Sequence, residues 1–267
     1  MILSICIPTY NRRAEMEKLL QSIPQSIRSD IEICVSDDGS NDGTRALIEA
    51  QDSFDIRYAY MPNRGRAHAL RDAILMANGK YSLLMDSDDY FLEGALQTLL
   101  NLLRSRKYPA YIFAVESNKG RHSINPCVKT FIQHRLCQKK WLDLKEVVLT
   151  NELKSVLYKY GPNIRRVPTS MLWHRLSGLE CLSVNEPLIF KNYLEGGLTK
   201  NIRKIKSENL APLQDYYQEL VNSHFVDDHL FKLKASIKLG FYDGRVDGVN
   251  FFQRIFVYIG RLIRKCI

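Results

Sequence analysis

The chain has 267 residues, of which 45% are hydrophobic and 25% charged, a composition that excludes a disordered or fibrous protein. A chain of this length buries enough surface to fold without disulfides or a structural metal. Its net charge of +9 is uneven: residues 1–100 carry 10 basic against 15 acidic side chains, a net of −5, and residues 101–267 carry 28 against 14, a net of +14, which predicts an acidic site followed by an anion-binding surface.

The first hundred residues alternate between strand and helix patterns. Strands are predicted at 2–8, 31–36, 56–61 and 81–85, from apolar or alternating runs that end in polar residues. Helices are predicted at 13–27, 44–51, 66–77 and 93–103, from apolar residues at helical spacing. This order indicates an α/β fold with a mostly parallel central sheet flanked by helices, in which ligands bind at the carboxyl ends of the strands.

Acidic residues gather at two of these strand ends. The segment 37–40 (DDGS) follows the second strand, and 86–89 (DSDD) follows the fourth. Three carboxylates in four residues repel one another unless a cation lies between them, so segment 86–89 predicts a divalent metal, Mn²⁺ or Mg²⁺, that bridges phosphates. Alternatively, these acids cap the following helix and form its first turn, and segment 37–40 alone is typical of an ordinary turn.

Three motifs stand in a fixed order in this half: residues 5–12 (ICIPTYNR), 35–44 (VSDDGSNDGT) and 79–89 (GKYSLLMDSDD). Together they resemble the family 2 glycosyltransferases with the GT-A fold, over residues 1–105. The resemblance implies a nucleotide-diphospho-sugar donor. It also implies roles for individual residues: Pro8, Thr9 and Tyr10 would line the nucleoside pocket, Asp38 would bond the base, Asp86 would face the ribose or the metal, and Asp88, helped by Asp89, would hold the metal against the diphosphate.

The chain departs from the family pattern on the helix predicted at 66–77. Relatives often carry Ala-Arg-Asn there, whereas this chain has the segment 69–72 (ALRD). Arg71 is expected to supply the missing positive charge from a neighbouring position and to bind the donor. The alternative is that Arg71 and Asp72 form a solvated helix face.

The second half of the chain gives a weaker signal. A strand is predicted at 110–115, a polar loop at 116–125 and a helix at 141–160. An inverting sugar transfer needs a carboxylate base near the acceptor hydroxyl. The resemblance places that base near 167–173 (VPTSMLW), but Thr169 stands where an acid is expected. We therefore choose Glu180 as the catalytic base, with the other candidates being Glu152, Glu186 and Glu195.

The last segment has the pattern of an amphipathic helix. Apolar side chains recur at helical spacing between 251 and 263, with Arg254, Arg261, Arg264 and Lys265 among them, and Gly260 weakens the helix slightly. This predicts binding to an anionic membrane surface, whereas the alternative is packing on the domain or on a second copy. No segment is long enough to span a membrane, and neither a signal-peptide pattern nor paired cysteines occur, so we expect a cytoplasmic protein, peripheral on the inner face of the cell membrane.

These features predict three parts: the nucleotide-sugar-binding half of the domain (1–105), its acceptor-binding half (106–205) and a helical C-terminal extension (206–267). The expected function is a metal-dependent, inverting sugar transfer to a hydroxyl on a saccharide or lipid-linked saccharide, in bacterial surface polysaccharide biosynthesis. Thr169 keeps open the alternative of a non-catalytic nucleotide-sugar-binding subunit of a polysaccharide assembly complex. No nucleic-acid motif accompanies the basic second half, so no nucleic-acid partner is expected.

Overall fold

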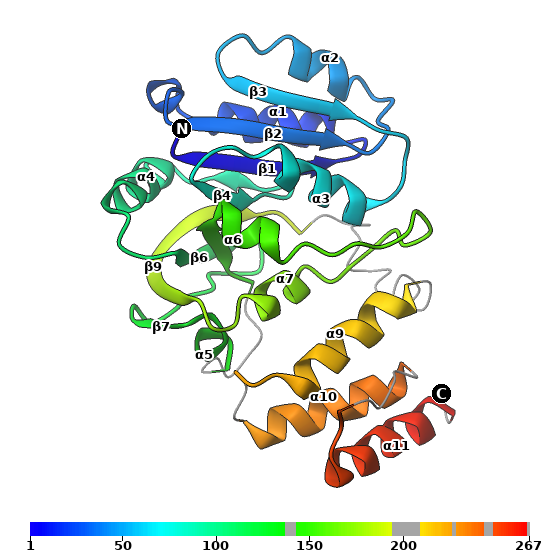
Figure 1. Ribbon diagram of the computed structural model, residues 1–267. Coiled ribbons are helices and arrows are strands. Elements are labelled where there is room, and N and C mark those ends of the chain that lie inside the picture. Colours follow the sequence, from blue (N-terminus) through cyan, green and yellow to red (C-terminus); the bar gives the residue numbers. More distant parts are fainter. Residues whose placement is uncertain (137–142, 194–208, 226–227, 243–247, 266–267) are drawn as a thin grey trace.

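The computed structural model describes residues 1–136, 143–193, 209–225, 228–242 and 248–265. In this part of the chain a single mixed sheet has the strand order β3-β2-β1-β4-β8-β6-β9-β5, with β7 paired to β9 (Figure 1). The strands are β1 (Leu3–Thr9), β2 (Ile31–Asp37), β3 (Asp55–Tyr60), β4 (Tyr81–Leu84), β5 (Tyr90–Phe91), β6 (Ala110–Ser117), β7 (Val128–Thr130), β8 (Lys145–Leu149) and β9 (Glu180–Lys191).

The stretch from β3 to β4 is parallel and follows the predicted alternation of strands and helices. Helices α1 (Arg13–Gln21), α2 (Thr44–Glu49) and α4 (Ala95–Ser105) cover one face of the sheet, and α3 (Arg66–Met76) covers the other. Because both faces are covered, every residue of β1 and β2 is buried. The helix predicted at 13–27 ends earlier, at Gln21, and a short 3-10 turn follows Pro24.

Beyond β4 the sheet becomes mixed, because β8 runs antiparallel between β4 and β6 while β9 runs parallel to β6. The helix predicted at 141–160 is therefore wrong over 145–149, where the chain forms β8 and then α6 (Thr150–Ser155); residues 141 and 142 lie outside the described residues. Val147 and Val148 are fully buried in this strand. Their β-branched side chains suit a sheet interior, and the pairing partners that decide the matter are distant in sequence.

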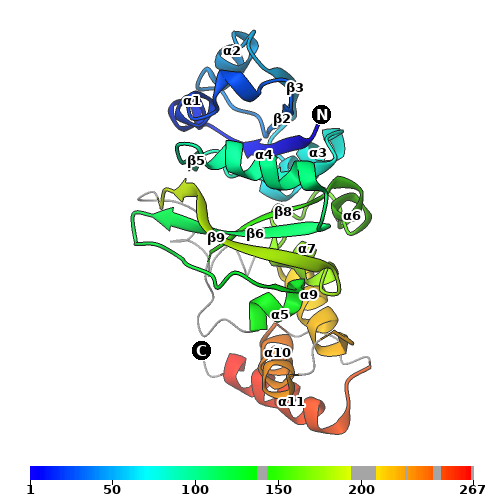
Figure 2. The same ribbon diagram turned by 90° about the vertical axis from the view of Figure 1, so that its left-hand side faces the viewer.

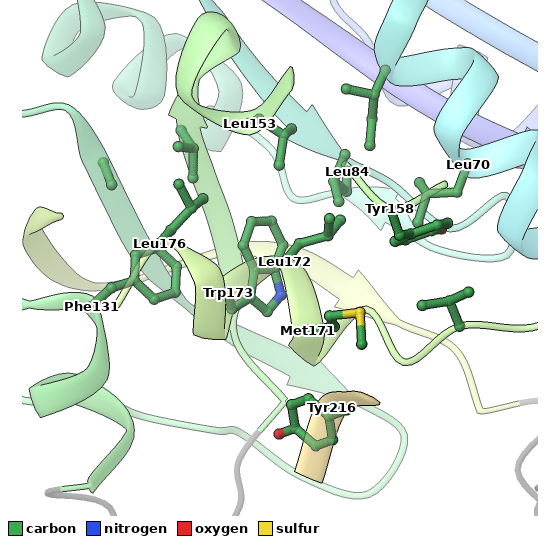
Figure 3. Close-up of a cluster of buried hydrophobic side chains, with 14 of the residues drawn as sticks. Leu70, Leu84, Phe131, Leu153, Tyr158, Met171, Leu172, Trp173, Leu176 and Tyr216 are labelled. Atoms are coloured by element: carbon green, nitrogen blue, oxygen red, sulfur yellow. The ribbon is translucent and has the colours of Figure 1, made fainter. Parts of the chain in front are cut away.

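A buried cluster fixes the segment that precedes α7 (Ser170–Arg175) (Figure 3). Met171, Leu172 and Trp173 of this helix are buried among side chains from α3, β4, α6 and α9. Trp173 stacks on Phe131 of α5 (Phe131–Leu136), with ring centroids 5.6 Å apart. A short helix with so many buried contacts cannot shift without opening the core, so the residues just before it are held in place.

The C-terminal extension contains the helices α9 (Leu210–Asn222), α10 (His229–Phe241) and α11 (Phe251–Lys265), at the end of the molecule away from β1–β3 (Figures 1 and 2). Arg175 of α7 joins it to the domain through an ion pair with Glu219 of α9, Nη2 to Oε1 2.6 Å. The predicted helical extension is thus present. The boundaries at 105 and 205 remain predictions, and residue 205 lies outside the described residues. Within the described residues, no helix has both the length and the apolar character needed to cross a membrane.

Candidate active site

The predicted donor and metal residues other than Arg71 lie at the edge of the sheet where β1, β2 and β4 have their carboxyl ends. Thr9, the last residue of β1, pairs with Asp37, the last residue of β2. Residues 86–89 follow β4 after one intervening residue. The neighbouring strand β8 is antiparallel to both β4 and β6. Since β6 and β9 consequently run in the same direction as β4, the last residue of β9, Lys191, also reaches this edge.

The residues assigned to the nucleoside pocket lie together at the end of β1. Pro8 and Thr9 are buried, and Tyr10 is half exposed at the rim. The Asp38 backbone N–H donates to the Thr9 carbonyl at 2.9 Å, which places Asp38 beside them. The buried Thr9 Oγ1 has no hydrogen-bond partner within the described residues. A buried hydroxyl in this condition is what a ligand with a polar edge would satisfy.

Asp37 and Asp38 have different partners, although they are adjacent in the chain. The Asp37 carboxylate accepts from the Ser40 N–H at 2.7 Å, within its own turn, and from the Tyr58 hydroxyl of β3 at 2.8 Å. The Asp38 carboxylate instead accepts from the backbone N–H groups of Arg64, at 2.7 Å, and Gly65, at 2.8 Å. Burial raises the pKa of Asp38, and these two donors only partly offset it. Asp38 therefore fixes the loop before α3, and its contact with a base remains a prediction.

The three carboxylates after β4 have three different environments. Asp86 forms an ion pair with Arg66; burial opposes its ionisation, but the charges of Arg66, Lys191 and Lys145 outweigh burial and lower its pKa. Asp89 is almost fully buried, and its Oδ2 lies 3.5 Å from the Lys145 Nζ. Burial raises the pKa of Asp89 to about 6, although Lys145 opposes this. The predicted metal role of Asp89 thus competes with an internal partner.

Asp88 is the carboxylate that fits a divalent metal. Among the described residues no basic side chain lies within ion-pair distance of it, and burial together with the charge of Asp86 raises its pKa. No group of three metal-ligating side chains is found in the described part of the chain. Mg²⁺ needs only one or two protein carboxylates when substrate phosphates complete its shell, and a bound cation would relieve the repulsion that Asp88 experiences. Asp88 is therefore compatible with a metal held jointly by protein and diphosphate.

The positive charge beside Asp86 comes from Arg66, which the sequence reasoning missed. Arg66 occupies the first position of α3 and also donates to Thr169 Oγ1 at 3.3 Å. Arg71 lies more than one turn further along the helix, where its Nη1 is 3.5 Å from Asp72 Oδ1. Arg66 pairs with Asp86 in this structure, and the donor contact expected of Arg71 stays a prediction. Asp72 is largely buried and also pairs with Arg64, Nη2 to Oδ2 2.7 Å.

Glu180 does not lie at this edge. It is the first residue of β9, pairs with Thr130 of β7 and is exposed. Because β9 is parallel to β6, and Lys191 at its other end is the residue near the aspartates, Glu180 lies at the opposite edge of the sheet, roughly 35 Å along the strand. A base must reach the reacting hydroxyl within hydrogen-bond distance, so the assignment of Glu180 is wrong in this structure. Glu195 lies outside the described residues.

A different carboxylate does lie near Lys191. Asp143, shortly before β8, is 3.6 Å from the Lys191 Nζ through its Oδ2 and accepts a hydrogen bond from the Tyr193 hydroxyl. Half of its side chain is exposed. Burial acts to raise the pKa of Asp143, but Lys191 and Tyr193 more than offset this and lower it. The sequence carried no local signal for Asp143, because its neighbours at this edge are about fifty residues away.

Comparison with known proteins gives a consistent picture. A family model described as "Glycosyl transferase family 2" matches residues 4–152. An abequosyltransferase of Salmonella typhimurium is 36% identical over 112 residues, covering 40% of this chain and 34% of that protein. A GalNAc(5)-diNAcBac-PP-undecaprenol beta-1,3-glucosyltransferase of Campylobacter jejuni is 35% identical over 37% of this chain and 33% of its own length. The chain thus aligns with about a third of these relatives' length.

Two solved structures resemble the fold over nearly the whole chain. TarS of S. aureus (residues 1–349), in complex with UDP-GlcNAc, has a TM-score of 0.68 at 16% identity and covers 97% of this chain and 79% of that one. A mannosyltransferase of Pyrobaculum calidifontis, in complex with GDP-Man and Mn²⁺, has a TM-score of 0.56 at 16% identity and covers 99% of this chain and 75% of that one. At such low identity these likenesses establish a shared fold.

Proposed function

Because the chain belongs to the family 2 glycosyltransferases, we propose that it transfers a sugar from a nucleotide-diphospho-sugar to a hydroxyl acceptor in bacterial surface polysaccharide biosynthesis. The observation that carries this proposal is the juxtaposition of Thr9, Asp38, Asp86 and Asp88 at one edge of the sheet. Nucleotide-sugar complexes of two proteins with the same fold support it. We propose an acceptor of the saccharide or lipid-linked saccharide class, which the name of the Campylobacter relative, a GalNAc(5)-diNAcBac-PP-undecaprenol glucosyltransferase, supports.

In the proposed mechanism, Pro8, Thr9 and Tyr10 bind the nucleoside, and Asp38 orients that pocket by fixing the loop before α3. Asp88 holds the divalent metal, Mn²⁺ or Mg²⁺. When bound, the metal would neutralise the charge that develops on the leaving nucleoside diphosphate. Asp86, kept ionised by Arg66, faces the ribose. The buried Asp89 supports the turn through Lys145 rather than through the metal.

We further propose that the transfer inverts the sugar configuration. A direct displacement needs a carboxylate that takes the proton of the acceptor hydroxyl on the side away from the leaving group. Such a base must be accessible to the acceptor and ionised. Asp143 is exposed at the same edge as Asp86, and its lowered pKa keeps it ionised at neutral pH. Residues 106–205 would then form the acceptor-binding half, and the protein would act at the inner face of the cell membrane.

The first test is a thermal-shift panel of nucleoside diphosphates and nucleotide-sugars, each with and without Mn²⁺. A ligand that binds only the folded protein raises Tm by mass action. We expect one base to raise Tm in a metal-dependent manner. In Asp88→Asn the metal-dependent part of the shift should disappear, whereas in Asp52→Asn, an exposed acid between α2 and β3, it should persist.

Two outcomes would decide between the proposal and its alternative. Donor hydrolysis or transfer by the purified protein, lost in Asp88→Asn, would exclude the non-catalytic subunit. A metal-dependent shift without any turnover, in protein tested with several acceptor saccharides, would favour that subunit. A complete lack of shift in folded protein would contradict donor binding itself.

A further inference from the structure

The loop before α7 carries a partly buried cation, Arg166, one of whose nitrogens is buried without a hydrogen-bond partner among the described residues. The Arg166 Nη1 is buried and has no hydrogen-bond partner among them. Burial lowers the pKa of Arg166, and the nearby charge of Arg66 lowers it further, while Asp86 acts in the opposite direction. A buried donor without a partner destabilises the folded state, and a charged one does so more strongly. The fold tolerates this cost at a point beside the candidate active site.

The position of Arg166 is fixed from several sides. The Ala67 N–H of α3 donates to the carbonyl of Arg165 at 3.2 Å. The same carbonyl lies so near Gly65 that a Cβ there would meet it at 2.4 Å, which explains why the loop can approach α3 so closely. On the other side, the Arg166 N–H donates to Asn209 Oδ1 at 3.0 Å. The guanidinium therefore belongs to a firmly held backbone.

Arg166 and Asp88 each lack a full partner of opposite charge among the described residues. Asp86 is already paired with Arg66, so it leaves Arg166 without a full partner, and its charge also disfavours ionised Asp88. A single ligand that brings a divalent cation to Asp88 and anionic oxygens to Arg166 would satisfy both. A nucleoside diphosphate with its metal has this composition. An anion alone would serve Arg166 and leave Asp88 unrelieved.

We propose that Arg166 binds the diphosphate group of the donor, and of the nucleoside diphosphate that leaves, together with Arg66. This inference rests on the proposed function and assigns a residue from the second half of the chain to the donor. The donor site is then completed only when the loop 161–168 is packed on α3. Phosphate oxygens of an acceptor would have the same chemistry, and the experiment below separates the two sources.

The experiment measures, by titration calorimetry with Mn²⁺, the Kd of a nucleoside diphosphate and of the matching monophosphate, whose base is the one found in the thermal-shift panel. We expect Arg166→Gln to weaken diphosphate binding about 10- to 100-fold, the loss typical of a charge-assisted hydrogen bond, and to lower the preference for diphosphate over monophosphate. Arg166→Lys should recover part of the lost diphosphate affinity. Arg28→Gln, which removes an exposed cation before β2, should bind like the wild type.

A second readout distinguishes binding from a structural role. Because Arg166→Gln removes a partly buried charge whose Nη1 has no hydrogen-bond partner among the described residues, the ligand-free variant should have a Tm equal to or above that of the wild type. Diphosphate affinity equal to that of the wild type in folded Arg166→Gln would overturn the inference and direct attention to an acceptor phosphate. If the wild type itself binds no nucleoside diphosphate, the proposed function fails with it.

Discussion

Glu32 shows how one buried carboxylate organises the parallel part of the sheet. It lies in β2 and accepts hydrogen bonds from the Ser4 hydroxyl in β1, at 2.6 Å, and from the Gly79 N–H before β4, at 2.7 Å. Arg57 of β3 completes the set with its Nε 2.8 Å from Oε2. Burial acts to raise the pKa of Glu32, but these donors and the Arg57 charge outweigh it and lower the pKa. Four elements are thus tied to one side chain.

We predict that Glu32→Gln lowers the free energy of unfolding by about 2–4 kcal/mol at pH 7, because a charged acceptor of several buried donors is lost. Since the folded-state pKa lies below the ordinary value of 4.5, this stabilisation is present above that value and is lost as the pH falls through the folded-state pKa. Urea unfolding of both proteins between pH 7 and 4 should show the gap narrowing at the acidic end. The exposed Glu49→Gln should change stability by less than about 0.5 kcal/mol.

Local patterns were sufficient for the acids of the candidate site and insufficient for its cations. Asp38, Asp86 and Asp88 are recognisable because each follows a strand within a continuous motif. The roles of Arg66 and Arg166 depend on contacts with residues 20 or more positions away, across a loop whose packing no local pattern encodes. Glu180 was misplaced for the same reason. The direction of β9, which follows from pairing with β6, puts it at the far edge.

At the scale of elements, α10 and α11 form a close pair whose contact depends on two glycines. A Cβ on Gly240 would lie 1.9 Å from the Val257 carbonyl oxygen, and one on Gly260 would lie 2.0 Å from that of Ile237. Val257 itself is 1% exposed in the contact. The sequence alone indicates only that Gly260 weakens the helix. In the structure Gly260 allows the backbones of α10 and α11 to approach closely. Amphipathic periodicity predicted α11, whereas its partner could not be read from periodicity alone.

We predict that Gly240→Val lowers the free energy of unfolding by about 1–3 kcal/mol or more, because the added side chain meets backbone that cannot move aside without separating the helices. Urea unfolding followed by circular dichroism measures this. Gly161→Val is the matched control, since a Cβ there has nothing within 4 Å. If the control loses as much stability as Gly240→Val, the close approach of α10 and α11 is not the cause.

At the scale of the whole molecule, the extension presents an apolar face that nothing in the described residues covers. Phe251 is 73% exposed, Phe252 71% and Tyr258 61%. Opposite them, Gln253 and Val257 are buried. Across α10 and α11 the sequence places basic side chains and no acidic ones: Lys232, Lys234, Lys238, Arg254, Arg261, Arg264 and Lys265. Apolar burial and attraction to anionic lipid act together on such a surface.

We therefore predict that the full chain binds vesicles containing phosphatidylglycerol and binds vesicles of phosphatidylcholine alone at least about tenfold more weakly, with the difference decreasing as salt rises. Co-sedimentation measures both. The double substitution Phe251→Ser and Phe252→Ser should weaken binding at least about tenfold, because each phenylalanine contributes apolar burial, whereas Leu75→Ser on exposed α3 surface should not. If binding is absent while the wild type forms dimers that the double variant cannot form, this face joins two copies instead. In that case, the net negative charge of residues 1–100 and the net positive charge of residues 101–267 would reflect only the acidic residues of the candidate active site and the basic residues around it.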